Sequence, residues 1–271
     1  MTTHLRSVYL NLSPGELPAS FPLSVPAIRS IAGETLNFDA PVTFLVGENG
    51  SGKSTLLEAI AVAAKSITVG SVSVTRDPSL KGAQRLAREL RLTWSKRTHR
   101  GFYMRAEDFF GYARAMEQAR DEFAAEIETI RNDDSLSDRA RGLAMMPHAG
   151  QLAALTQSYG EGLDARSHGE AFLALFQARL VPDGLYLLDE PEAPLSPRRQ
   201  IALLAMMKDA VENQGAQFLV ATHSPILMAY PGGAIYSFDD EVVRQVPFAE
   251  IDHVVITRDF LTHPELFLRH L

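Results

Sequence analysis

The sequence predicts an α/β protein in which helices flank a largely parallel β-sheet. Two observations support this fold class. Short apolar runs typical of buried strands recur along the chain and alternate with stretches of helical spacing. A long segment rich in Ala, Glu and Arg, about residues 106–165, interrupts the alternation and has few β-branched residues. It therefore predicts a helical insert within the α/β unit.

The elements before the insert follow in order. Residues 1–40 are rich in Pro and short apolar runs, which predicts edge strands and turns. Residues 41–46 (PVTFLV) predict a buried strand, and residues 55–65 (TLLEAIAVAAK) predict a helix by propensity and apolar spacing. Within the insert, Asp133-Asp134 and Gly160-Glu161-Gly162 mark two expected breaks.

The alternation resumes after the insert. Residues 185–188 and 217–221 predict strands, and residues 198–214 predict the helix between them. Residues 234–238 and 242–246 predict a terminal hairpin around Asp239-Asp240-Glu241. We expect a single domain over residues 1–271, with an α/β core formed by 1–105 and 166–271 and a helical subdomain at 106–165.

Composition excludes several classes of protein. The chain has no cysteine, so disulfides, zinc fingers and iron–sulfur clusters are excluded. The sequence contains no window of about 18 uninterrupted apolar residues, so we expect no segment that spans a bilayer. The first residues lack a secretion-signal pattern, and we therefore expect a cytoplasmic protein. The net charge of −7 gives no overall attraction to nucleic acid. Residues 76–105, however, carry nine Lys/Arg against two acids, with Trp94 and Phe102 interleaved.

A glycine-rich motif between the first strand and its helix predicts a phosphate-binding loop. It reads G-x-x-x-x-G-K-[ST], and its residues are Gly47, Glu48, Asn49, Gly50, Ser51, Gly52, Lys53, Ser54 and Thr55. Successive backbone amides at a helix N-terminus form an anion-binding nest. Lys53 adds positive charge near the β and γ phosphates, and the Ser54 hydroxyl suits Mg²⁺. The sequence therefore predicts a site for a nucleoside triphosphate.

Two later strands end in polar residues at the sheet edge where ligands bind in open α/β folds. Asp189 and Glu190 follow the strand at 185–188, and His223 follows the strand at 217–221. Asp189 is the candidate that holds Mg²⁺, and Glu190 is the candidate general base for the attacking water. His223 could reach the γ-phosphate or that water. The alternatives are a solvated strand end for the two acids and a structural role for the histidine.

Together these residues resemble the ATP-binding cassette (ABC) ATPase superfamily, and the resemblance covers most of the chain. Ser167-His168-Gly169-Glu170 (SHGE) resembles the ABC signature, usually LSGGQ, and precedes the acidic strand end. The resemblance implies a P-loop NTPase fold of the ABC type with a mixed sheet and a helical subdomain. It also implies head-to-tail homodimers, in which Ser167 and Gly169 of one copy contact the γ-phosphate held by the other.

Three departures from the family pattern stand out. Ser196 replaces the usual D-loop aspartate, and residues 101–107 offer no Q-loop glutamine. The aromatic residue that stacks on adenine in the family is not evident. Phe21 is one candidate, and the alternative interpretation of Phe21 is an aromatic of the core or of a sheet edge. The motifs most resemble small stand-alone bacterial ATPases that share GENGSGKST, RAE-x-FF (Arg105–Phe110), SHGE and ATHSPIL (Ala221–Leu227).

Two functions follow from the resemblance. The first is a soluble ATPase with Mg²⁺ and ATP at a composite dimer site, acting on nucleic acid or a partner protein. The second is the ATP-binding subunit of a transporter, docked on a separate membrane permease. The basic run at 76–105 suits contact with a phosphate backbone, and its alternative interpretation is a solvated face balanced by the acidic helices that follow.

Overall fold

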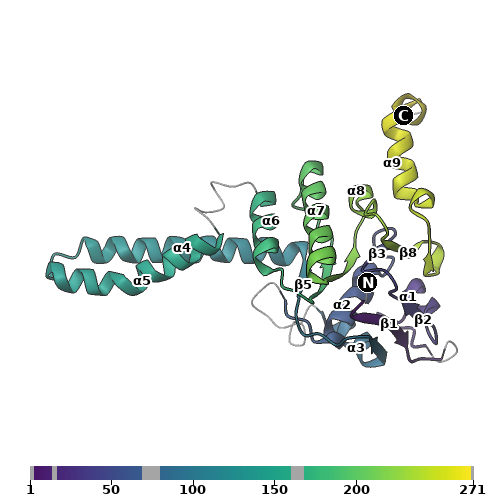
Figure 1. Ribbon diagram of the computed structural model, residues 1–271, viewed down its shortest axis with the longest axis horizontal. Coiled ribbons are helices and arrows are strands. Elements are labelled where there is room, and N and C mark those ends of the chain that lie inside the picture. Colours follow the sequence, from purple (N-terminus) through teal and green to yellow (C-terminus); the bar gives the residue numbers. More distant parts are fainter. Residues whose placement is uncertain (1–2, 14–16, 69–79, 160–167, 270–271) are drawn as a thin grey trace.

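The computed structural model describes residues 3–13, 17–68, 80–159 and 168–269. Figure 1 shows a body of strands and helices from which a long helical hairpin extends to one side. No helix in these four ranges combines the length and the apolar character needed to cross a membrane.

The main sheet has six strands in the order β5-β6-β7-β3-β8-β9. Its first five strands are parallel, and β9 pairs antiparallel with β8, which gives the mixed sheet expected. The strands are β5 (Tyr103–Arg105), β6 (Leu185–Asp189), β7 (Gln217–Ala221), β3 (Val42–Val46), β8 (Ala234–Ser237) and β9 (Arg244–Gln245). Every residue of β3, β6 and β7 is buried, as the continuous apolar runs predict for central parallel strands.

Helices cover both faces of this sheet, and each face has its own apolar core. Side chains of a strand alternate between faces, so Leu45, Leu187 and Leu219 pack with α2 (Lys53–Ala64) in one cluster. Their neighbours Phe44, Leu188 and Val220 pack in the second cluster with α6 (His168–Arg179) and α7 (Pro197–Gln214). Burial on both faces fixes the strand ends in space, and those ends carry the candidate site.

A separate three-stranded antiparallel sheet lies beside α2. Its order is β2-β1-β4, with β1 (Leu5–Leu10), β2 (Thr35–Asn37) and β4 (Leu90–Trp94), and α3 (Lys81–Glu89) precedes β4. The expectation of only strands and turns before residue 41 is wrong in one place, because α1 (Pro26–Ser30) is a short helix. Pro26 occupies its first turn, where a proline suits a helix start.

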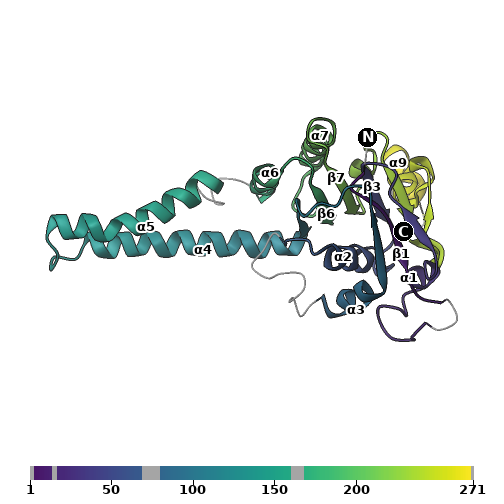
Figure 2. The same ribbon diagram turned by 60° about the horizontal axis from the view of Figure 1, so that its bottom comes forward.

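The insert forms the long hairpin of Figures 1 and 2, made of α4 (Ala106–Arg131) and α5 (Asp138–Tyr159) packed side by side. The chain turns between them at the predicted break. The Asp133 Oδ1 atom accepts hydrogen bonds from the backbone N and the hydroxyl of Ser135. The second predicted break, Gly160-Glu161-Gly162, lies outside the described residues.

The predicted hairpin near the end of the chain is confirmed, since β8 and β9 pair antiparallel around the 3-10 helix η4 (Asp239–Glu241). It is not terminal. A 3-10 helix η5 (Phe248–Glu250) leads into α9 (Asp252–Thr262) and α10 (Pro264–Leu268), which the sequence reading did not anticipate. A short helix, α8 (Pro225–Met228), follows β7.

Candidate functional site

The glycine-rich loop joins the end of β3 to the start of α2, the context that the motif requires. Three of its glycines have conformations that other residues resist. Gly47, Gly50 and Gly52 have φ angles of 140°, 81° and 107°. A Cβ atom at Gly47 would lie 3.0 Å from the Asp239 Oδ1 atom, and one at Gly52 would lie 3.0 Å from the Val25 Cγ1 atom. Glycine thus lets the backbone of the loop turn sharply and pass close to its neighbours at both ends.

Lys53 is the first residue of α2 and is only 4% exposed. Its Nζ atom donates hydrogen bonds to the carbonyl oxygens of Gly47 at 2.7 Å and Glu48 at 2.9 Å. Burial lowers the pKa of Lys53, and the nearby carboxylates of Glu190 and Asp189 oppose that shift. The ammonium group is therefore held inside the curve of the loop, with Ser54 and Thr55 next along the helix.

Ser54 and Asp189 come together from α2 and the end of β6. The Ser54 hydroxyl donates to the Asp189 Oδ1 atom at 2.9 Å. Asp189 is 7% exposed, and burial raises its pKa to about 7, while the Ser54 hydrogen bond lowers it. Two hard oxygen donors at the edge of a phosphate loop fit Mg²⁺, which keeps waters and takes its other ligands from phosphate.

Glu190 follows β6 directly, in a left-handed conformation with φ of 50°. Its backbone N donates to the carbonyl of Ala221 at 2.9 Å, which fixes this turn against β7. A non-glycine residue in this region costs about 1 kcal/mol or more, and such strain clusters at functional sites. The half-exposed carboxylate lies 3.7 Å from the His223 Nε2 atom.

His223 lies two residues beyond β7. Its backbone N donates to the Glu192 Oε1 atom at 2.7 Å, and its Nε2 atom is buried without a hydrogen-bond partner among the described residues. Burial lowers the pKa of His223, and the positive charge of Lys53 lowers it further. The imidazole is therefore neutral near pH 7, with one ring nitrogen available to a ligand.

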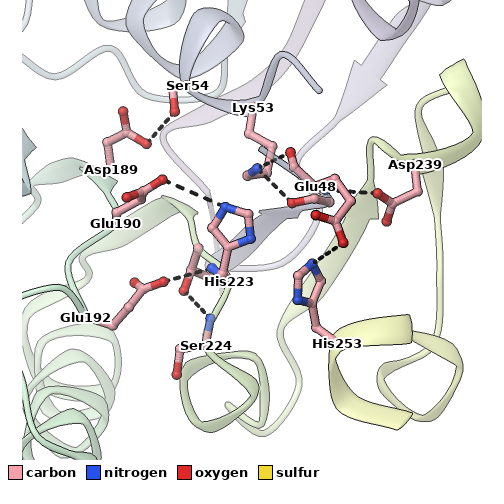
Figure 3. A network of polar contacts seen from close by, with 12 residues as sticks. Glu48, Lys53, Ser54, Asp189, Glu190, Glu192, His223, Ser224, Asp239 and His253 are labelled. Carbon is pink, nitrogen blue, oxygen red and sulfur yellow. Dashed lines mark hydrogen bonds and ion pairs between the residues drawn. The ribbon is translucent and has the colours of Figure 1, made fainter. Parts of the chain in front are cut away.

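Figure 3 shows three further residues that sequence reasoning missed. Asp239, at the end of β8, accepts from the backbone N of Glu48 at 2.9 Å and braces the loop. Glu192 supports His223 as described above, and burial raises the pKa of its carboxyl. His253, from α9, faces both Glu48 and His223. Position at a strand end next to β3 could have indicated Asp239, whereas no local pattern marks His253.

The signature region is only partly described. Ser167 lies outside the described residues. Gly169 lies in the first turn of α6, where a Cβ atom would come within 2.7 Å of the Arg199 Cδ atom and 2.9 Å of the Pro194 carbonyl. The neighbouring Glu170 pairs with Arg199 at 2.7 Å. Gly169 thus allows α6 to pack closely on the segment that follows the acidic strand end.

Two of the departures have a structural description. At the expected Q-loop position, Arg105 is in register with Asp189 and pairs with Asp108 at 2.8 Å. Phe21 is 55% exposed and packs on Gly82 of α3. It does not line the cavity of about 440 Å³ that opens beside Glu48 to Ser51. Nothing in these contacts supports Phe21 as the adenine-stacking residue.

The described residues of the basic run are distributed over α3, β4, β5 and the loop between the two strands, and β4 and β5 belong to different sheets. Lys96 pairs with Asp183 at 2.9 Å. Phe102 is 4% exposed and packs edge-on against Tyr186, so it cannot stack on a nucleic-acid base.

Two family models of known proteins match separate parts of the chain. A family model described as "AAA domain" matches residues 23–137, and one described as "AAA domain, putative AbiEii toxin, Type IV TA system" matches residues 170–229. No curated protein matches the sequence significantly.

The chain is similar, at low sequence identity, to solved structures that include ABC-transporter proteins and an SMC head domain. MJ1267, an ATP-binding cassette of an ABC transporter, is 16% identical over 100% of both chains, with a TM-score of 0.50. "An inward-facing conformation of a putative metal-chelate type ABC transporter" is 15% identical over 95% of this chain and 88% of that one, with a TM-score of 0.50. The SMC head domain from Thermotoga maritima is 17% identical over 90% and 99% of the two chains, with a TM-score of 0.44.

Proposed function

We propose that this chain is an ABC-type ATPase, which hydrolyses ATP at a site that two copies complete. Its matches to AAA-domain family models and its similarity in fold to an ABC-transporter cassette support the proposal. One observation carries the proposal. Lys53 and Ser54 at the start of α2, Asp189 and Glu190 at the end of β6, and His223 after β7 come from three separate segments and meet at the phosphate loop (Figure 3).

The loop and Lys53 supply the binding energy for the triphosphate. Backbone amides at the N-terminus of α2 carry partial positive charge, and the buried ammonium of Lys53 adds a full charge. Ser54 and Asp189 would hold Mg²⁺, which when bound neutralises charge on the phosphate oxygens. Binding of the phosphate tail therefore needs only one copy of the chain.

Glu190 and His223 divide the chemistry of hydrolysis. Glu190 takes a proton from the attacking water as the bond to the γ-phosphorus forms and the bond to the bridging oxygen breaks, releasing ADP and phosphate. Its half-exposed carboxylate is free of the Ser54–Asp189 pair, which suits a base. The neutral His223 ring offers an Nε2–H group to a γ-phosphate oxygen, provided the proton is on that nitrogen.

The second copy would supply Ser167 and Gly169. In the chain itself, the turn that carries Gly169 packs on Arg199 and the Pro194 carbonyl. The N-terminus of α6, a helix of 12 residues, would direct its partial positive charge toward the γ-phosphate of the partner. Closure of two such copies is the event that we propose ATP controls.

For the wider role, we propose action on nucleic acid or a partner protein. The α4–α5 hairpin supports this choice. It projects from the body (Figures 1 and 2), and α4 directly follows β5, whose last residue, Arg105, is in register with Asp189. A change at the site could be carried along this hairpin. The basic run lies on several elements, so by itself it does not favour nucleic acid over protein.

The test is ATPase activity of the purified protein, measured alone and with DNA, RNA or liposomes, with mass measured with and without ATP. We expect Mg²⁺-dependent hydrolysis and a dimer in the presence of ATP. Stimulation by DNA or RNA would identify a nucleic-acid partner, and stimulation by liposomes alone would favour the transporter subunit. Absence of both hydrolysis and ATP binding would refute the proposal.

A further inference from the structure

His253 is a second histidine at the candidate site, and it comes from the C-terminal helix α9 (Figure 3). Its ring meets the His223 ring edge-on, with centroids 5.2 Å apart and an interplanar angle of 70°. Its Nε2 atom lies 3.8 Å from the Glu48 Oε1 atom and, within the described ranges, has no hydrogen-bond partner. The side chain is only 23% exposed.

Apolar anchors fix His253 in this place. Ile251 precedes α9 and Val254 lies in its first turn, and both are buried in the core cluster that contains Leu188 and Val220. The backbone N atoms of Val254 and Val255 both donate to the Ile251 carbonyl at 2.9 Å. Beyond this turn the helix exposes Ile256, Phe260 and Leu261. The first turn of α9 is therefore firmly seated beside the site, while the rest of the helix extends away.

The His223 ring needs such support. Glu192 holds its backbone N, but the Glu190 carboxylate beside the ring lies beyond hydrogen-bond distance at 3.7 Å. Among the ring contacts of the described residues, His253 packs edge-to-face on the imidazole. Aromatic pairs in this arrangement favour one relative orientation. The rotamer of His223, and with it the direction of its free Nε2 atom, thus depends on His253.

We infer that His253 is a positioning residue, which orients the His223 ring toward the γ-phosphate and couples α9 to turnover. This inference rests on the proposed ATPase function. His253 would not touch the phosphate itself, so its effect should fall on the chemical step and leave ATP binding nearly unchanged.

The experiment measures kcat, KM for ATP and thermal unfolding for His253→Ala and His253→Phe. Phe keeps the edge-to-face contact and lacks the ring nitrogen that faces Glu48. We expect Ala to lower kcat about tenfold with little change in KM, and Phe to restore most of the rate. His263→Ala is the matched control, because His263 caps the other end of α9 through its backbone and its largely exposed side chain pairs with Glu265.

A double-mutant cycle separates positioning from general stability. In a His223→Ala background, His253→Ala should cause no further loss of kcat, because the ring that it orients is gone. Equal rates for wild type and His253→Ala would overturn the inference and leave the proposed function intact. Additive losses in the cycle, or failure of Phe to restore the rate in a folded protein, would also overturn it. If the wild-type protein hydrolyses no ATP, the proposed function itself fails.

Discussion

The phosphate-loop region and the signature region differ in how completely one chain builds them. Around the loop, Lys53, Ser54 and Asp239 each form a hydrogen bond to another residue of the site in the same chain. At the start of α6, Glu170 pairs with Arg199 and Gly169 packs on Pro194. The first region is thus organised around a ligand, whereas the second is organised around its own neighbouring helix.

This difference indicates a division of labour. A region whose polar atoms converge on an anion nest can bind a phosphate alone. A helix N-terminus with a glycine turn is a complement to such a site, and it needs a second surface to act on. Changes in the two regions should therefore separate ATP binding from turnover.

The largest effect should come from Lys53→Ala. The substitution removes the buried ammonium that lies within the curve of the loop, so ATP affinity should fall about a hundredfold or more. Equilibrium binding of ATP to the purified variant measures this. An unchanged affinity would show that the loop does not hold the phosphates.

Glu190→Gln should separate binding from chemistry within the loop region. The amide cannot take a proton from water, so hydrolysis should fall about a hundredfold or more while ATP binding persists. The variant should accumulate as an ATP-bound dimer, detected by mass measurement with ATP. Hydrolysis at the wild-type rate would rule out Glu190 as the base.

Ser167→Arg should affect only the signature region. A bulky charged side chain there should leave ATP affinity within about twofold of wild type but block dimerisation and turnover, as interface clashes do. Binding, mass and hydrolysis are measured on the same preparation. A fully active monomer with this change would contradict a composite site.

Glu192→Gln should have the smallest effect of these substitutions, a change in the pH dependence of folding stability. It tests whether the Glu192 carboxyl beside His223 is buried as the structure shows. Burial raises the pKa of Glu192, so the folded state binds its proton more tightly than the unfolded state does. The stability that this carboxyl contributes is therefore lost as the pH rises above 4.5, the ordinary pKa of a glutamate. Gln does not ionise, so the variant does not lose this stability. Urea unfolding from pH 4 to 8 should show the variant gaining stability relative to wild type. A constant difference across pH would contradict this.

The sequence predicted most of the sheet and the loop region because their signals are local. Continuous apolar runs at β3, β6 and β7 required burial on both faces, and parallel strands bring their carboxyl ends to one edge. Asp189 and His223 could therefore be placed near the loop from strand order alone. The contact between Ser54 and Asp189 joins residues 135 positions apart and follows from that topology.

The missed features depend on tertiary packing. His253 reaches the site because Ile251 and Val254, far from the loop in sequence, seat the start of α9 in the core cluster that contains Leu188 and Val220. Asp239 lies in a predicted turn, and only the pairing of β8 with β3 brings it to the phosphate loop. Phe102 is interleaved in a basic run, yet its position next to β5 buries it against Tyr186.

The most direct test of the central claim is complementation between Lys53→Ala and Ser167→Arg. Each variant alone should be inactive. In a mixed dimer, the intact loop of the Ser167→Arg chain meets the intact signature of the Lys53→Ala chain, so one site is whole. Each mixed dimer should hydrolyse ATP at about half the rate of a wild-type dimer, because one of its two sites is whole and we take the sites to act independently. No recovery in mixtures shown by mass measurement to contain mixed dimers would contradict a site shared between two copies.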